Sequence, residues 1–551
     1  MADGSATAAP STPATGRRRG PQLPVVASAP DPGRTVTPPR VILGRAPVVG
    51  VITLGCDKNT VDSERFMGTL QSAGARVRAD AEGADVIIVN TCGFIDAARE
   101  ESVDTILEAV RLKDEGRTGA VVALGCMVQR YGEELRAEIP EVDLFLGLTE
   151  IDRLVPELRQ RGLLPPPEDV PTMERPLRAL AGGAAHTSHL KISEGCDHAC
   201  AFCAIPLMRG RHRSSPMGAL VDEARALERR GTVELAIVSQ DTTWYGRDWV
   251  RAAAGRRSRA GGAALAPAEG GRAAAAGAGA AYGGWIGAPF ARMAGPVPAE
   301  GPAGPALPED LPSGTLPARG LLPELLLRLL AGTSIPWFRL FYMYPSGITT
   351  ELIDVMAANP RILPYLDMPI QHGSDRMLAR MRRPERRASI RARVESLRAA
   401  VDGIALRTTV ILGFPGETED DVDALIDLME DVRFDYLGAF AYSPEEGTPA
   451  LEMDGRVPAA AVRERLERVL DVQRGVTHDR NADRIGSLVD VLVDRPADAG
   501  TGTHAVGRMY AQAPEVDGVV YVRGAAGAPA GTMLRVRLTG ADETDLSGEV
   551  A

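Results

Sequence analysis

The sequence predicts an α/β protein in three parts: an N-terminal parallel α/β domain, a central partial (β/α) barrel and a small C-terminal β-barrel. Three observations predict this fold class. The chain has 551 residues, too many for one ordinary core. Short β-branched apolar runs alternate with helix-like stretches through most of it, as in parallel sheets with crossover helices. The C-terminal part instead shows short alternating runs between Gly-rich turns.

Composition narrows the class of protein. The net charge is −11, and this acidic balance is at least as compatible with a basic protein partner as with a nucleic acid. No apolar run reaches the about 18 residues of a membrane span, so we expect no membrane association. Residues 1–46 are rich in Pro, Ala, Ser and Thr and lack the apolar core of a secretory signal, so we expect a disordered tail.

The N-terminal domain is expected over residues 48–164. Its apolar runs VGVITLGC, ADVIIVNTC and AVVALGC end in Cys56, Cys92 and Cys126, with helix-like stretches at 62–74 and 97–112 between them. Parallel strands bring their carboxyl ends to one edge of a sheet, so the three cysteines are expected to converge there. We interpret them as ligands of a metal cluster; the alternative is three buried structural cysteines.

A Pro-rich linker is expected over residues 165–188, and the central domain over 189–480. Strand-then-helix units repeat through the central domain, which favours a parallel sheet that curls into a full or partial barrel. The expected strands are 234–239, 337–342, 365–370 and 404–412, and the helices that follow them are 349–358, 375–381 and 419–430. An Ala-, Gly- and Pro-rich stretch at about 252–319 interrupts the repeat and is expected to be a disordered insertion.

Three further cysteines lie near the start of the central domain, in the run KISEGCDHACAFCAIPLMR. Cys196, Cys200 and Cys203 have C-x3-C-x2-C spacing, and soft thiolates select iron–sulfur clusters or zinc. No fourth cysteine is near, whereas structural zinc takes four protein ligands. His198 is a poor fourth ligand because its own neighbours crowd it. The pattern favours three corners of an iron–sulfur cluster with one open position; structural zinc or unrelated thiols are the alternatives.

The C-terminal domain is expected over residues 483–551, after a charged helix at about 459–480. Its expected strands are 488–494, 519–522 and 534–538. From Arg484 to Ala551 the chain has six arginines and no lysine against nine acidic residues, a net charge of −3. This balance disfavours binding to a polyanion.

Taken together, the motifs resemble the methylthiotransferases of the radical S-adenosylmethionine superfamily. The matching segments are LGCDKNTVDSE, NTCGFI, the Gly125–Cys126 pair, the cysteine triplet and ILGFPGETE. The resemblance covers about Val48 to Gly540 apart from the insertion, which is foreign to the family. It implies a three-cysteine domain, a radical domain and a TRAM β-barrel. Gly373 is a second departure, because a bulkier residue is expected there.

The resemblance implies two [4Fe–4S] clusters and S-adenosyl-L-methionine used in two ways. The cluster at the triplet would split the cofactor into methionine and a radical that abstracts hydrogen from an unactivated C–H bond. The cluster at Cys56, Cys92 and Cys126 would hold the sulfur that a second molecule of the cofactor methylates. Cofactors of this kind carry the hard chemistry, so no catalytic side chain is expected beyond the cluster ligands. Both clusters are expected to face one cavity, with the first domain docked over the barrel mouth.

The resemblance also suggests residues that bind S-adenosylmethionine. Phe202 is expected near the adenine, with ordinary core packing as the alternative. Gln240 and Asp241 end a strand and are expected at the methionine part, unless they are loop residues. Arg407, expected just before the strand Thr408–Leu412, would pair with the cofactor carboxylate.

Two glycines and two asparagines complete the expected site. Gly413 and Gly416 would allow close approach of the backbone to the cofactor, with a simple turn as the alternative. Asn59 and Asn90 lie next to cluster cysteines in the sequence and are expected to orient them.

Within the family, the sequence is most similar to the enzymes that modify the β-carbon of an aspartate in small-subunit ribosomal protein S-twelve. The segments SQDTTWYG, YMYPSG and LPYLDMPIQHGSDRMLARMRRP carry this similarity. The implied partners are ribosomal protein S-twelve as substrate and an electron donor such as flavodoxin or ferredoxin, with no specific nucleic-acid binding. Such clusters need reduced thiols, which predicts the cytoplasm.

Two alternatives stay open at this point. A relative that methylthiolates transfer-RNA adenosine would share every cluster ligand. It would be expected to have a basic C-terminal barrel with exposed aromatic residues, but this barrel is acidic and has only Tyr510 and Tyr521. The other alternative is an iron–sulfur redox protein that turns over no substrate, which would leave the cofactor motifs and the TRAM-like barrel without a role.

Overall fold

The computed structural model describes residues 45–170, 178–179, 185–253, 320–497 and 504–551. Nearly all of the expected tail and of the 252–319 insertion lies outside these residues. Within the described ranges, no helix combines the length and the apolar composition that crossing a membrane requires.

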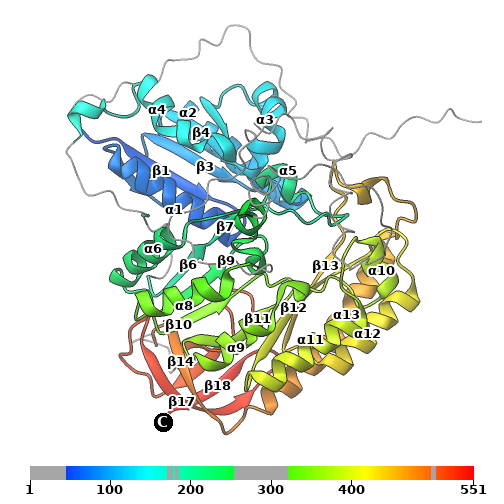
Figure 1. Ribbon diagram of the computed structural model, residues 1–551. Coiled ribbons are helices and arrows are strands. Elements are labelled where there is room, and N and C mark those ends of the chain that lie inside the picture. Colours follow the sequence, from blue (N-terminus) through cyan, green and yellow to red (C-terminus); the bar gives the residue numbers. More distant parts are fainter. Residues whose placement is uncertain (1–44, 171–177, 180–184, 254–319, 498–503) are drawn as a thin grey trace, which may run out of the picture. The chain divides into compact units, whose positions relative to one another are not determined.

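The N-terminal part is a five-stranded parallel sheet in the order β2-β1-β3-β4-β5 (Figure 1). Its strands are β1 (Val48–Thr53), β2 (Arg76–Arg78), β3 (Val86–Thr91), β4 (Ala120–Gly125) and β5 (Leu144–Gly147). Its helices are α1 (Asp57–Ser72), α2 (Asp96–Asp114), α3 (Cys126–Glu138) and α4 (Leu154–Gln160). Every residue of β3 and β4 is buried, as expected for central strands covered on both faces.

The first helix begins five residues earlier than the sequence pattern predicts. Gly55 has a positive φ of +89°, and Cys56 is extended, so the chain turns directly from β1 into α1. Asp57 lies in the first helical turn, where a negative charge is favoured by the helix dipole. The prediction of a start at residue 62 was therefore wrong, because this turn leaves no loop.

The central part is a six-stranded parallel sheet in the order β13-β12-β11-β10-β9-β6. Its strands are β6 (Thr187–Lys191), β9 (Glu234–Val238), β10 (Trp337–Leu340), β11 (Ile362–Asp367), β12 (Ala405–Leu412) and β13 (Tyr436–Ala441). Its helices are α5 (Ile205–Arg209), α6 (Met217–Arg229), α8 (Leu322–Gly332), α9 (Thr350–Ala358), α10 (Asp375–Arg380), α11 (Arg387–Ala400) and α12 (Glu419–Val432). A short ribbon of β7 (Ser193–Glu194) and β8 (Arg213–Ser214) flanks the cysteine loop.

Two strand boundaries in this part differ from the predictions. β11 begins at Ile362 and includes Pro364, a residue that argues against a strand interior. The register between β10 and β11 shifts at this point, and such an irregularity accommodates a proline. The strand predicted at 404–412 corresponds to β12, so Arg407, which the cofactor hypothesis placed just before a strand at 408–412, lies inside β12 and pairs in register with Asp367. The pattern also missed α11 and β13.

The C-terminal part is a closed barrel in the order β14-β15-β16-β18-β17, drawn in orange and red in Figure 1. Its strands are β14 (Leu488–Arg495), β15 (His504–Met509), β16 (Val520–Arg523), β17 (Met533–Ala541) and β18 (Leu546–Val550). The long helix α13 (Ala459–Ala482) packs on α12 and β13 before the chain enters this barrel. The α/β fold class with a terminal β-barrel is confirmed, although β15 and β18 were not predicted.

The small barrel shares an apolar core with the central sheet. Ala236 and Tyr365 of the sheet belong to the same buried cluster as Val491 and Val522 of the barrel. Glu234 lies at this junction, and its carboxylate accepts hydrogen bonds from Arg339 (2.5 Å) and Arg508 (2.6 Å). The small barrel therefore packs on one face of the central sheet, opposite the face that the helices cover.

Candidate active site

Cys56, Cys92 and Cys126 follow three neighbouring strands, β1, β3 and β4, at the same edge of the N-terminal sheet. A Cβ atom added to Gly55 would lie 2.9 Å from the Cys92 sulfur, so the loop that carries Cys56 lies against Cys92. Cys126 is the first residue of α3. The structure thus brings these cysteines to the common edge that the strand pattern predicts.

Two asparagines hold this edge together. The Asn59 side chain donates to the carbonyls of Leu54 (2.8 Å) and Thr91 (3.2 Å), and its oxygen lies 3.6 Å from the Cys126 sulfur. Asn90 donates to the Asn59 carbonyl at 3.0 Å. Asn59 therefore contacts a cysteine directly, whereas Asn90 supports Asn59.

Burial controls the ionisation of these thiols. It raises the pKa of Cys126 to about 12, although Arg209 nearby opposes the rise. Burial also raises the pKa of Cys92 above its ordinary value. Ligation by a metal overrides such a shift because a coordinated thiol is deprotonated.

The second cysteine set lies in the loop between β7 and α5. Backbone hydrogen bonds fix this loop: Cys196 donates to the Gly210 carbonyl (3.1 Å) and Ala201 to the Met381 carbonyl (2.9 Å). Gly195 has a φ of +73°, and a Cβ atom there would lie 2.2 Å from the Arg211 carbonyl oxygen, so only glycine fits.

Polar groups surround the sulfur of Cys200. The Tyr344 hydroxyl lies 3.2 Å from it, and the Arg383 guanidinium lies 3.9 Å from it. Arg383 also lies over the Tyr344 ring, 3.6 Å from its centroid. Both groups can stabilise negative charge on this sulfur.

The donor set of each cysteine group suits a cluster better than a single ion. No group of three His, Cys, Asp or Glu side chains among the described residues is arranged to hold one metal ion. A single zinc needs its sulfur ligands at about 2.3 Å from one point, whereas a cluster carries each thiolate on a separate iron. His198 donates no fourth ligand, since its Nε2 lies 2.6 Å from Asp241 and its ring stacks on Tyr344.

A buried charge network that was not predicted from the sequence links the segments that carry the two cysteine sets. Arg209 of α5 contacts Asp62 (3.1 Å), Glu194 (2.8 Å) and Asn59 (2.5 Å), and Lys191 also pairs with Asp62 and Glu194. Although burial raises it, Lys191 and Arg209 lower the pKa of Glu194 to about 2. The only sequence signal for this network is the dense charge of KISEGC beside the triplet.

Apolar packing also joins the two sets. Cys126 shares a small buried cluster with Ala204, the residue after Cys203, and with Met208. Arg99 and Arg130 of the N-terminal part both reach Glu445, which follows β13, at 2.6 and 2.8 Å. The carboxyl edge of the N-terminal sheet therefore contacts the loops of the central sheet, as the two-cluster hypothesis requires.

The four residues predicted at the cofactor have different surroundings. Phe202 is half-buried and packs edge-to-face on Phe414, with ring centroids 6.5 Å apart. Gln240 donates to Glu194 (3.1 Å), within the charge network. Asp241 is fully buried; it accepts from the Thr243 backbone (2.9 Å) and contacts His198.

Arg407 has two acidic partners. It pairs with Asp367 (2.8 Å) and with Asp517 of the small barrel (3.4 Å). Two carboxylates already neutralise this guanidinium, so the structure gives no support to a pairing with the cofactor carboxylate.

The glycines of the ILGFPGETE segment form a turn. Gly413 and Gly416 have φ values of +76° and +83°. A Cβ atom on Gly413 would lie 2.4 Å from Val462, and one on Gly416 would lie 3.0 Å from Arg380. The close approach at these positions is to the chain itself. Gly373 is explained in the same way, because a Cβ atom there would lie 2.6 Å from the Leu425 backbone.

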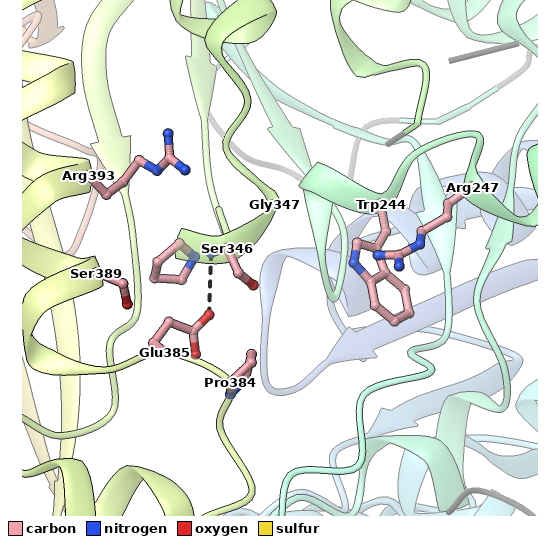
Figure 2. Close-up of a pocket in the computed structure, with 9 residues that line it drawn as sticks. Trp244, Arg247, Ser346, Gly347, Pro384, Glu385, Ser389 and Arg393 are labelled. Carbon is pink, nitrogen blue, oxygen red and sulfur yellow. Dashed lines mark hydrogen bonds between the residues drawn. The ribbon is translucent and has the colours of Figure 1, made fainter. Parts of the chain in front are cut away.

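A pocket of about 450 Å³ opens beside the cysteine loop, between the segments that follow β9 and β10 and the start of α11 (Figure 2). Trp244 and Arg247 line one side and Arg393 the opposite side. Glu385 accepts a hydrogen bond from the Ser346 backbone at its wall (3.3 Å). Its lining includes none of the six cysteines.

Comparison with known proteins adds three family matches. Residues 48–147 match an uncharacterized protein family, UPF0004, residues 314–429 match the radical SAM superfamily, and residues 485–551 match the TRAM domain. The radical SAM match begins at residue 314, near the end of the expected insertion, and does not include the cysteine loop.

The solved structures that match this chain are distant in sequence. The radical S-adenosylmethionine methyltransferase TsrM from Kitasatospora setae is 14% identical, with a TM-score of 0.44, over 74% of this chain and 77% of that chain. The cobalamin-dependent S-adenosylmethionine radical enzyme OxsB is 12% identical with a TM-score of 0.44, over 78% of this chain and 56% of that chain.

Curated relatives are much closer. The ribosomal protein uS12 methylthiotransferase RimO of Symbiobacterium thermophilum is 41% identical, over 94% of this chain and 93% of the relative. RimO proteins of Anaeromyxobacter sp. (strain Fw109-5) and Aquifex aeolicus are 40% and 37% identical over similar spans. With identity of this level along nearly the whole of both chains, and with two cysteine triplets brought together by the fold, this chain belongs to the RimO family of radical SAM methylthiotransferases.

Proposed function

We propose that this enzyme adds a methylthio group to ribosomal protein uS12, at the β-carbon of an aspartate. The observation that carries the proposal is that the segments carrying the two cysteine sets pack together, with Arg209 contacting both Glu194 near the triplet and Asn59 of the N-terminal part. Its relatives of similar length are named for the same reaction on uS12, which favours this substrate over transfer RNA. The acidic terminal barrel agrees with a basic protein partner.

We infer that Cys56, Cys92 and Cys126 hold one [4Fe–4S] cluster and that Cys196, Cys200 and Cys203 hold the other. Each set offers three soft ligands and leaves one position for a ligand from outside the protein. When bound, these clusters and S-adenosylmethionine supply the radical, the sulfur and the methyl group. The residues of the chain then have the tasks of holding, orienting and shielding them.

Several side chains suit these tasks. The Asn59 amide bonds the Leu54 and Thr91 carbonyls and so fixes the loops that carry Cys56 and Cys92. Arg209 places a positive charge near Cys126, which favours the thiolate form. At the second set, the Tyr344 hydroxyl and the Arg383 guanidinium lie beside the Cys200 sulfur and can hold it in place. Among the residues predicted to bind the cofactor, Phe202 and Gln240 are the ones that lie beside the second cysteine set. Phe202 packs on Phe414, and Gln240 donates to Glu194.

The reaction needs further partners. We propose a protein electron donor such as a flavodoxin or a ferredoxin. We also propose a cytoplasmic location, because the ligands of both clusters must be reduced thiols. The terminal barrel, with a net charge of −3, is expected to make no specific contact with nucleic acid.

The test is the intact mass of uS12 purified from a strain that lacks this gene, compared with the parent strain. Replacement of C–H by C–SCH₃ adds one CH₂S unit, so the deletion is expected to lower the mass by about 46 Da. Complementation with the wild-type gene should restore the mass, whereas complementation with Cys56→Ala or Cys200→Ala should not.

An unchanged mass of uS12 in the deletion strain would contradict the proposed substrate. Nucleoside analysis of transfer RNA from the same strains distinguishes the remaining possibility, since loss of a methylthioadenosine there would reassign the substrate and leave the cluster chemistry in place.

A further inference from the structure

An aromatic stack connects the pocket of Figure 2 with the sulfur of Cys200. The Trp244 ring, in the pocket wall, lies 4.0 Å from the His198 ring, centroid to centroid. His198 stacks on Tyr344 at 3.8 Å with nearly parallel planes, 4° apart. The Tyr344 hydroxyl then lies 3.2 Å from the Cys200 sulfur. Three conjugated rings thus lead without a gap from the pocket to a predicted cluster ligand.

The outer end of this stack is basic, although the chain as a whole has a net charge of −11. The guanidinium of Arg247 lies 4.4 Å from the Trp244 ring centroid and that of Arg251 lies 5.2 Å from it. Burial and the neighbouring charge of Arg251 lower the pKa of Arg247. Like charges held together in this way favour an anionic partner.

The carboxylates near these arginines do not cancel their charge. Asp197 accepts from Arg251 (2.8 Å) and Arg211 (3.4 Å), and both arginines stay about half exposed or more. Glu385 pairs with Arg383 at 3.2 Å, inside the wall. Arg393 lines the opposite side of the pocket. Asp241 also acts on Arg247, but it is fully buried and is bound by His198, so the more exposed charges on this face are those of the arginines.

We propose that this basic face is the docking site of an acidic electron-carrier protein and that the Trp244–His198–Tyr344 stack is the side on which the electron enters. The inference rests on the proposed function, because it takes the Cys200 loop to hold a reducible cluster. One electron leaves the carrier, which is oxidised by one electron, and reduces the cluster by one electron. Electron-transfer complexes are small and weak, and opposite charge guides their formation.

Docking is tested by calorimetric titration of the anaerobically reconstituted enzyme with an oxidised bacterial flavodoxin, an acidic flavoprotein that serves as the probe. The double variant Arg247→Glu/Arg251→Glu should bind it about tenfold more weakly, because two attractions become repulsions. The matched control is Arg117→Glu/Arg535→Glu, which makes the same change in net charge at exposed positions elsewhere. Added salt should weaken binding of wild type. Equal affinities for all three proteins would overturn the docking site.

Electron entry is tested by stopped-flow measurement of cluster reduction. Reduced flavodoxin and dithionite are used in parallel, and the ratio of the two rates is compared between variants. With flavodoxin at concentrations that saturate each protein, so that a change in affinity does not contribute, Trp244→Leu should lower this ratio about tenfold. Trp244→Phe, which keeps an aromatic ring, should recover most of it. A ratio unchanged in Trp244→Leu would overturn the role of the stack.

A wrong cluster assignment and a wrong docking site would give different results. If dithionite reduces no cluster in a Cys56→Ala/Cys92→Ala/Cys126→Ala protein, which retains the triplet, the cluster assignment in the proposed function is wrong. If dithionite reduces that cluster but the flavodoxin affinity does not depend on Arg247 and Arg251, the docking inference alone is wrong.

Discussion

At the scale of single residues, the site depends on buried charges that the motifs do not include. Arg209 is 2% exposed and satisfies Asp62, Glu194 and Asn59 at once, so it fixes the position of α5 relative to α1. A buried ion pair contributes little compared with an apolar pair, but loss of one partner leaves an uncompensated charge. Arg209 is therefore expected to be intolerant of neutral replacements.

The variant Arg209→Met should lower the free energy of unfolding by about 2–3 kcal/mol, below the usual cost of breaking a buried pair. The reason for the smaller value is that Glu194 stays 30% exposed and Lys191 still pairs with it. Arg209→Lys keeps the charge and should lose less. Urea unfolding of the cluster-free protein measures both, and equal stability of Arg209→Met and wild type would contradict this role.

At the scale of elements, glycines decide how closely helices approach loops. Helix α12 passes so close to Gly373 that any side chain there meets the Leu425 backbone. Gly475, in the middle of α13, has no atom near its missing Cβ and is exposed. The same residue type is thus required at one position and unfavourable at the other.

These two glycines make a matched pair. Gly373→Ala should destabilise the protein by about 1–3 kcal/mol through overpacking. Gly475→Ala should stabilise it by about 0.5–1 kcal/mol, because alanine loses less backbone entropy in a helix. Thermal unfolding of both variants beside wild type checks the signs, and a Gly373→Ala protein as stable as wild type would show that α12 can shift.

At the scale of the whole molecule, Asp517 links the terminal barrel to the central sheet. Its carboxylate accepts from Tyr365 (2.8 Å) and from the Ala513 backbone (2.9 Å), and Arg407 lies 3.4 Å away. Burial raises the pKa of Asp517 to about 6 from its ordinary 3.8, although Arg407 opposes the rise. The interface therefore prefers the protonated acid.

The sign of the pH effect follows from the raised pKa. The contribution of Asp517 to stability is fully present below about pH 4 and is lost as the pH rises through 6. Relative to Asp517→Asn, which cannot ionise, wild type should lose about 2–3 kcal/mol between pH 4 and pH 7. Chemical unfolding at several pH values measures the difference. Asp490→Asn, at an exposed position of β14, should show no such trend, and a flat difference for Asp517→Asn would contradict the raised pKa.

Much of this molecule was predictable because its signals are local. The three apolar runs that end in cysteine specify buried strands, and the parallel rule then puts Cys56, Cys92 and Cys126 on one edge. The triplet Cys196, Cys200 and Cys203 can be identified as a set of candidate ligands from its spacing alone. Boundaries were less predictable where a single residue changes the backbone path, as at Gly55 and Pro364. Strands β15 and β18 were missed because their alternation is weak in the sequence.

The sequence by itself determined the class of fold, the six cysteines as candidate ligands and the resemblance to the methylthiotransferases, since these depend on residue type and spacing. Only the tertiary structure decided which side chains surround the cysteines. Tyr344 and Arg383 come from segments distant in the chain from Cys200, Arg209 reaches Asn59 of the N-terminal part, and Arg407 faces Asp517. Contacts of this kind depend on how the elements pack against one another, and a local sequence pattern carries no information about that packing.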